Sequence, residues 1–303
     1  MRGYRTDLAV ELRDSAMREY AKTNEGEIDG VIYKEEKINE NITKSTIEII
    51  NEAGERAIGK ERGKYITFIF PEPDEMDRVC FDALYKALSD TFRELCLNEE
   101  NAARSMLFCG LGNRKLTADS IGPAAADGIL ATHHIKASDA ELFSQIGFFD
   151  TAVISPGVSS QTGMETFDTV KSAVFSVKPD VVIAADALCA RGTARLCKTI
   201  QLSTTGISPG AGIGNFHGKL DEKGIGVPVI GVGVPTVIDA ATLVCDFAGD
   251  EKLHEKISQK AGGLFVSPKN ADTGIKILSR ILSYAVNTAF QSGLTAEETE
   301  LMQ

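Results

Sequence analysis

The sequence predicts a three-layer α/β protein in which a twisted, mostly parallel central sheet is flanked by helices, with a small antiparallel strand region near the N-terminus. From Ser105 onward, near-continuous apolar strands alternate with helical segments, the pattern of a parallel sheet buried on both faces. At 30–70, short strands rich in Val, Ile, Thr and Tyr are separated by turn residues, which favours antiparallel pairing. A hydrophobic content of 43% over 303 residues can fill a substantial core. We therefore expect one domain spanning 1–303.

The first hundred residues are expected to form a short helix, three strands and a long helix. Apolar residues at helical spacing predict an amphipathic helix from Leu8 to about Tyr20, within an N-terminal segment at 1–30. The strands GVIYKEEKI, ITKSTIEII and GKYITFIF are expected to form a side sheet at 30–70. Helical spacing from Met76 to Leu97 predicts the long helix.

The predicted α/β core at 105–303 contains four apolar strands, SMLFCGLGN, TAVISPG, DVVIAADAL and PVIGVGVPT. Ligands bind such sheets beyond the carboxyl ends of the strands, so we expect function there. The segment TIQLSTTGISPGAGIGN, at 199–215, carries four glycines and one proline in its second half and is expected to be a loop at that rim. The tail at 270–292 predicts a helix whose apolar face packs on the sheet.

Composition narrows the class of protein. A net charge of −11 and a pI near 5.0 argue against a basic nucleic-acid surface. The chain has no apolar run of membrane-spanning length, and its N-terminus is polar from the second residue, so we expect a cytoplasmic protein that binds neither a membrane nor nucleic acid. The cysteines lie in apolar segments without a CxxC pair and are expected to be reduced, mostly buried thiols. They are Cys80, Cys96, Cys109, Cys189, Cys197 and Cys245.

The loop GLGNRKLTADSIGP, at 110–123, follows an apolar strand and precedes a predicted helix. It is not a dinucleotide fingerprint, because that motif needs glycine at its sixth position, where this chain has Lys115. The loop places Asp119 at the carboxyl end of a strand, where its carboxylate would face a substrate, with Asn113 as a supporting candidate. A helix N-cap is an equally weighted interpretation of Asp119.

The segment DVVIAADALCARG places Asp186 directly after a run that should be buried in the sheet. A buried carboxylate is costly unless it is paired, hydrogen-bonded or protonated, so Asp186 predicts a site at the strand tip. Capping, or a salt bridge to Arg191, is the equal alternative. If Asp119 and Asp186 share one water, one as base and the other as protonated acid, they form the arrangement that aspartic peptidases use on an amide.

The loop SPGVSSQTGMETFD, at 155–168, is a third candidate region. Its backbone N–H groups would steady an oxyanion or hold a substrate backbone. An ordinary polar loop is the favoured interpretation, and a serine nucleophile is disfavoured because no GxSxG motif occurs. The candidate residues of this loop are Ser155, Gly157, Ser159, Ser160, Thr162, Glu165 and Asp168.

The four histidines, His133, His134, His217 and His254, show no recognisable metal-ligand spacing. The adjacent pair is most simply a helix-end feature. We expect neither a metal site nor a cofactor.

Seven fragments in one order resemble the germination protease family of spore-forming bacteria, which is related in fold to hydrogenase maturation endopeptidases. Each fragment is weak alone, but the ordered set covers most of the chain and is specific. The fragments are RTDLAVE, NEAGERAIGKERGKYIT, GLGN..LT.D.IGP, SPGV...TGMET.D, IAADALCAR, GI.PG.GIGN and GVPTVIDA.

The resemblance implies an endopeptidase, active as a homotetramer in the spore core, that cleaves small acid-soluble spore proteins after an acidic residue during germination. The family's two essential aspartates fall on Asp119 and Asp186. We expect the loops at 155–168 and 206–215 to hold the substrate, with Arg191 and Asp239 as further supporting candidates. The alternatives are a serine or threonine hydrolase on the same fold and a noncatalytic carbohydrate- or nucleotide-binding protein.

In the N-terminal segment, an acidic residue, an aliphatic residue and an alanine follow one another as Asp7, Leu8 and Ala9. The resemblance implies the same order in a substrate. We therefore expect the N-terminal segment to occupy the cleft as a product-like or self-cleaved segment, with the bond between Asp7 and Leu8 as the candidate for autoprocessing. The family makes a proenzyme, and 1–7 would be the remainder of its prosegment. Only four residues precede Arg5, so a short zymogen and a nearly mature chain both remain open.

Overall fold

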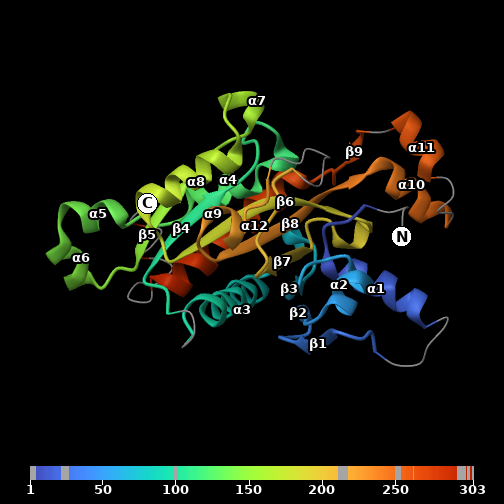
Figure 1. Cartoon of the computed structure of the whole chain (residues 1–303), viewed down its shortest axis with the longest axis horizontal. Helices are drawn as coiled ribbons and strands as arrows, with labels where there is room; N and C mark the ends of the chain where they lie inside the picture. Colours follow the sequence, from blue (N-terminus) through green and yellow to red (C-terminus); the bar gives the residue numbers. More distant parts are fainter. Residues whose placement is uncertain are drawn as a thin grey trace.

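A single mixed sheet, with strand order β1-β2-β3-β7-β8-β6-β4-β5 and β9 added to β8, forms the centre of the molecule (Figure 1). The computed structural model describes residues 5–21, 27–98, 102–210, 218–249, 254–261, 263–291, 298 and 301. The expectations for 211–215 and for His217 lie outside the described residues. The fold class is α/β, as the alternation of strands and helices predicts.

The part of the sheet that carries the candidate site is parallel, as predicted. Its strands are β4 (Ser105–Gly110), β5 (Asp150–Ile154), β6 (Val181–Ala190) and β8 (Val229–Asp239). The strands pair in the order β5-β4-β6-β8. All four run in the same direction, so their carboxyl ends meet at one edge of the sheet.

The N-terminal strands pair antiparallel, also as predicted, and are continuous with the parallel part. They are β1 (Val31–Lys37), β2 (Thr43–Ile49) and β3 (Gly63–Ile69). The connection is β7 (Thr199–Ser203), which pairs antiparallel with both β3 and β8. The residues at 30–70 therefore belong to the same sheet as the core strands.

The expectation of a loop throughout 199–215 is wrong for its first five residues. Thr199–Ser203 is a strand buried along its whole length. The segment is short, and the glycine-rich residues after it dominate the composition of the stretch. Its strand character comes from two hydrogen-bonding neighbours, one of them about 130 residues away in sequence, which local patterning does not reveal.

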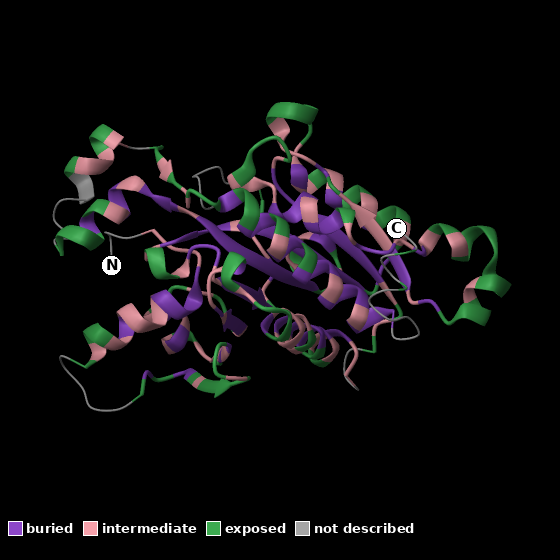
Figure 2. Ribbon diagram, turned by 180° about the vertical axis from the view of Figure 1, so that it is seen from behind, coloured by how far each residue is buried: buried purple, intermediate pink, exposed green. Residues whose placement is uncertain are grey.

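Helices cover both faces of the sheet and give it three layers. On one face, α3 (Arg78–Cys96), α4 (Ile121–Asp127) and α12 (Ala271–Phe290) share a core with β3, β4, β6, β7 and β8. On the other face, α1 (Ala9–Tyr20) and α2 (Glu52–Ile58) cover the N-terminal strands. There α8 (Thr166–Val177) and α9 (Glu222–Ile225) cover β4 and β6. Figure 2 shows the buried residues concentrated in the central strands.

The three helices expected from apolar spacing are confirmed as α1, α3 and α12, within about two residues at each end. Asp77 begins α3 because its carboxylate accepts the N–H of Cys80 at 2.7 Å, a typical N-cap. All six cysteines are free and buried, as predicted. In the described part of the chain, no helix combines the length and apolar character needed to cross a bilayer.

The remaining elements lie at the ends of the sheet. Two short helices, α5 and α6, extend away from it (left of Figure 1) and bury none of their residues. The short elements are α5 (His133–Ser138), α6 (Ala140–Ile146), α7 (Ser159–Thr162), α10 (Ala240–Ala248), α11 (His254–Ala261), β9 (Phe265–Val266) and the 3-10 helices Pro73–Glu75, Thr117–Asp119 and Thr193–Arg195.

Candidate active site

Asp119 and Asp186 line one cavity of about 410 Å³ at the carboxyl edge of the parallel strands. The rest of its lining comes from three loops: 112–116, 158–166 and 209–210. The two aspartates thus converge in the structure, and their carboxylates are brought together from β6 and from the loop that follows β4.

The early end of β4 exposes Asp186 to this cavity. Gly110 is the last residue of β4 and lies opposite Ala185, so from Asp186 onward β6 pairs only with β8. The expectation that Asp186 stands at the strand tip needs correction, because β6 continues to Ala190. Asp186 is the first residue of β6 beyond the pairing with β4, and its side chain lines the cavity.

Asp186 is only 5% exposed and accepts backbone hydrogen bonds from Ala187, at 2.9 Å, and from Gly210. Burial raises the pKa of Asp186 well above its usual value, and the negative charge of Asp119 raises it further. The two backbone bonds oppose this shift. Asp186 therefore tends to hold its proton under conditions in which an ordinary aspartate is ionised.

Asp119 is half-buried at the end of a 3-10 helix, and its carboxylate closes the loop that carries it. Its Oδ2 accepts the N–H of Asn113 at 2.8 Å. Burial raises the pKa of Asp119, while the Asn113 bond opposes that rise. The helix α4 has Ser120, not Asp119, at its N-cap, so the capping interpretation of Asp119 does not hold.

Gly112 allows the loop to pass directly over Asp119. Its φ is +110°, and a Cβ at this position would lie 2.2 Å from the Asp119 carbonyl oxygen. Any other residue would therefore have to push the aspartate out of place. Thr236 holds the loop from the other side, with its hydroxyl donating to the Ala118 carbonyl at 2.5 Å.

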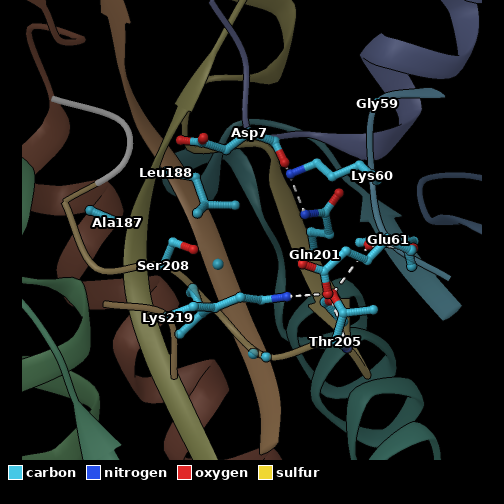
Figure 3. A pocket seen from close by; sticks show the side chains of 16 residues that line it. Asp7, Gly59, Lys60, Glu61, Ala187, Leu188, Gln201, Thr205, Ser208 and Lys219 are labelled. Atoms are coloured by element: carbon cyan, nitrogen blue, oxygen red, sulfur yellow. Dashed lines mark hydrogen bonds and ion pairs between the residues drawn. The ribbon is translucent and has the colours of Figure 1, made fainter. Parts of the chain in front are cut away.

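A second cavity, of about 240 Å³, is bordered by Ala187 and Leu188, the two residues that follow Asp186 (Figure 3). Two lysines, Lys60 and Lys219, contribute to its lining, together with Gln201 and Asp7. Lys219 is paired with Glu61 at 2.5 Å. Sequence reasoning missed Lys60 and Gln201: the lysine follows a helix end without any motif of its own, and the glutamine lies in the strand that was expected to be a loop.

The N-terminal segment runs along this second cavity. The N–H of Asp7 donates to the Cys189 carbonyl at 2.8 Å, and the N–H of Cys189 returns a bond to Asp7 Oδ2 at 2.8 Å. The amide of Gln201 bonds on either side of Leu8: Nε2 donates to the Asp7 carbonyl at 3.3 Å, and Oε1 accepts the Ala9 N–H at 2.7 Å. Leu8 itself is fully buried.

The candidates of the 155–168 loop separate into two groups. Ser159 and Ser160 line the cavity of the two aspartates, and Glu165 accepts the Ser159 hydroxyl at 3.2 Å. The others lie around this loop: Ser155 and Asp168 are exposed, and Thr162 bonds to the Met164 carbonyl within the turn. Gly157 has a positive φ of +72° and accepts the Thr166 hydroxyl. Thr166, which also lines the cavity, was not among the candidates.

Two further candidates have structural partners away from the aspartate cavity. Arg191 Nε pairs with Asp246 at 3.1 Å, and its Nη1 donates to Ser15 at 3.0 Å. Asp239 caps α10 by accepting the N–H of Thr242 at 2.9 Å. Asp239 thus serves as a helix cap, and Arg191 connects the end of β6 to α10 and to the N-terminal helix.

The histidine pair begins α5, as a helix-end feature should. His133 Nδ1 lies 2.8 Å from an oxygen of Asp150. The side chain of His254 lies outside the described part of the chain. Across the described residues, no three His, Cys, Asp or Glu side chains form a group that could hold a metal ion.

The fold and the cavity define an α/β protein with a candidate acid/base site, in which a proton-holding carboxylate and a second, more accessible one face the same space. Comparison with known proteins gives the family. A sequence model described as germination protease matches residues 9–249. The chain belongs to the germination protease family, a family of peptidases.

Individual relatives agree with this assignment. The germination proteases of Clostridium perfringens (strain ATCC 13124) and Clostridium tetani are each 36% identical to this chain, and the alignments cover 98% and 97% of both chains, respectively. That of Priestia megaterium is 40% identical over 80% of this chain and 65% of its own. A solved structure, the [NiFe] hydrogenase maturation protease HycI of Thermococcus kodakarensis, aligns with a TM-score of 0.36 and 14% identity over 66% of this chain and 99% of its own. The family assignment rests on the sequence relatives.

Proposed function

We propose that this chain is a spore germination endopeptidase in which Asp119 and Asp186 activate water as an acid/base pair. The observation that carries the proposal is their position on one cavity, where the charge of Asp119 contributes to the raised pKa of Asp186. Two carboxyl groups with different environments can hold one proton between them, which is what amide hydrolysis by a carboxylate pair requires.

The environments of the two carboxyl groups suggest their roles. Asp186 is the more buried and keeps its proton, so it acts as the general acid that protonates the departing amide nitrogen. Asp119 is half-buried and keeps a backbone bond that favours its ionised form, so it acts as the general base that takes a proton from water. The water oxygen then bonds to the carbonyl carbon, and the C–N bond breaks as Asp186 gives up its proton.

The family assignment supports a proposal for the substrates. They are small acid-soluble spore proteins, cleaved after an acidic residue during germination. The enzyme acts as a homotetramer in the cytoplasm of the spore core, with no direct role for nucleic acid or membrane. The loops at 158–166 and 209–210 border the cavity on either side of the aspartates and hold the substrate chain.

A serine hydrolase is the second candidate, because Ser159 lines the same cavity and its hydroxyl donates to Glu165. The two mechanisms predict opposite effects of substitutions on the cleavage rate. Asp119→Asn and Asp186→Asn should each lower the cleavage rate of a purified small acid-soluble spore protein by about a hundredfold or more, while Ser159→Ala and Ser160→Ala should preserve it.

Cleavage is followed by gel electrophoresis, with mass spectrometry of the fragments. Loss of activity in Ser159→Ala with full activity in both asparagine variants would replace the aspartate mechanism by the serine one. Intact substrate after long incubation with the unaltered enzyme would favour a noncatalytic binding protein.

A further inference from the structure

Lys60 contributes its amine to the lining of the second cavity, near the carboxylates of Asp7 and Glu61. It follows Gly59, the residue that ends α2, and Figure 3 shows its side chain extending toward Asp7. Within the part of the chain that the structure describes, its ammonium group has neither an ion pair nor a hydrogen bond. Burial lowers the pKa of Lys60, an effect that the carboxylates of Asp7 and Glu61 oppose and Lys219 reinforces. An ammonium group that is withdrawn from water without a partner is costly, and a bound anion would remove that cost.

Lys219, the other cation of the lining, is in a different situation. It pairs with Glu61 at 2.5 Å and lies 3.8 Å from Asp221. Its charge is therefore already balanced by two carboxylates of the protein. Lys60 is the lysine of this cavity that is available to a ligand.

The cavity lies directly beside the candidate acid along β6. Ala187 and Leu188 line it, and they directly follow Asp186 on β6. Gly233 of β8 lies opposite Asp186, and a Cβ there would lie 2.2 Å from Leu188 Cδ1. The absence of a side chain at Gly233 lets Leu188 fold against the sheet beside the cavity.

The chain itself shows how a polypeptide passes this cavity. Asp7 lines the cavity, and Gln201, which also lines it, bonds to the carbonyl before Leu8 and to the N–H after it. These contacts involve only the backbone of the peptide and so suit any sequence, whereas the charge of Lys60 distinguishes between side chains. The residue of the segment that reaches the cavity lining is an acid, Asp7.

We infer that Lys60 is a specificity-determining residue, whose ammonium group binds the carboxylate of the acidic substrate residue on the amino side of the bond to be cut. This inference rests on the proposed peptidase function and assigns one of its binding pockets. A carboxylate gives Lys60 its missing partner, while the amide of asparagine or glutamine cannot neutralise the charge.

The test compares two fluorogenic peptides with the sequence Thr-Asp-Leu-Ala-Val-Glu, identical to residues 6–11, one of them carrying Asn in place of Asp. The unaltered enzyme should prefer the Asp peptide. Lys60→Gln should lower kcat/KM for the Asp peptide about tenfold or more and leave the Asn peptide nearly unchanged. Lys60→Arg, which keeps the charge, should keep the preference. Lys64→Gln, a lysine of β3 outside this cavity, is the matched control and should behave like the unaltered enzyme.

Binding gives a second readout that does not need turnover. In an Asp119→Asn background, isothermal titration should show tighter binding of the Asp peptide than of the Asn peptide, and Lys60→Gln should abolish that difference. If the Asp119→Asn protein with Lys60 in place bound both peptides with equal affinity, the inference would be overturned. Cleavage of both peptides at equal rates would also overturn it while leaving the peptidase proposal intact. Failure to cut either peptide or a spore protein would instead count against the proposed function.

Discussion

Asp186 on β6 and Gln201 on β7 face the same side of the sheet in one row, with Gly233 of β8 between them. The row continues through Thr67 and Ser45, both fully buried. Most of a sheet interior is apolar, so this polar row sets apart the strip on which the N-terminal segment lies. The row therefore extends from Asp186, the candidate acid, to Gln201, which bonds to the backbone of the N-terminal segment.

Replacing Asp186 should stabilise the folded protein at neutral pH. The raised pKa means that the folded state holds a proton which the unfolded chain releases above about 3.8. Stability therefore falls as the pH rises from that value toward the folded-state pKa, by about 1.4 kcal/mol for each pH unit between the two pKa values. Asp186→Asn should remove this loss. Its melting temperature should exceed that of the unaltered protein at pH 7 and match it near pH 3; an equal difference at both pH values would contradict the raised pKa.

The pH dependence of kcat/KM should be bell-shaped. The acidic limb reports the ionisation of the base and should lie above the usual range for aspartate, because burial raises the pKa of Asp119. The alkaline limb reports loss of the proton from the pair. Initial rates on a spore-protein substrate between pH 4 and pH 9 would show both limbs. A rate that stays flat across the acidic side would exclude Asp119 as the base.

Removing the Gln201 amide should loosen the N-terminal segment. Gln201→Leu leaves the buried N–H of Ala9 without its acceptor and should cost about 1–3 kcal/mol of unfolding free energy, measured by urea denaturation. Hydrogen exchange at Ala9 should become faster. Gln145→Leu on the exposed helix α6 is the control, with an expected change within about 0.5 kcal/mol. Unchanged exchange at Ala9 would show that other contacts hold the segment.

Gly112→Ala should disrupt the site as well as the fold. Both a positive φ and a 2.2 Å approach to the Asp119 carbonyl oppose a side chain there. Gly147→Ala is the matched control, because its φ is +76° but nothing lies within 4 Å of its Cβ position. The control should lose only about 1–2 kcal/mol of stability and keep its activity. The Gly112 variant should lose more stability and most of its activity, measured by thermal unfolding and spore-protein cleavage. Equal effects in both variants would mean that backbone strain alone matters.

The bond between Asp7 and Leu8 is the predicted place of self-processing. After acidification, mass spectrometry should detect a new N-terminus at Leu8 in the unaltered protein and none in Asp119→Asn. An unchanged N-terminus under activating conditions would end this hypothesis.

Local patterning predicted most of the elements. The helices α1, α3 and α12 follow from apolar spacing, and the four parallel strands follow from near-continuous apolar runs. The strand β7 escaped this approach because its five residues carry little signal next to a glycine-rich stretch. Asp119 and Asp186 stood out because a carboxylate after an apolar strand needs an explanation. Helix capping explained the two aspartates equally well from the sequence, but the structure places both of them on one cavity.

The sequence by itself determined the class of fold and the family, and it made Asp119 and Asp186 candidates, because each of these depends on residues that are neighbours along the chain or on a motif of fixed spacing. Tertiary structure alone decided that β4 ends opposite Ala185 and so opens a space beside Asp186. It also decided that Lys60 and Gln201, about 140 residues apart, share a cavity with the N-terminus. Such proximity arises from the pairing of β3 with β7 and of β7 with β8, and the free energy of those contacts depends on the whole sheet rather than on any local pattern.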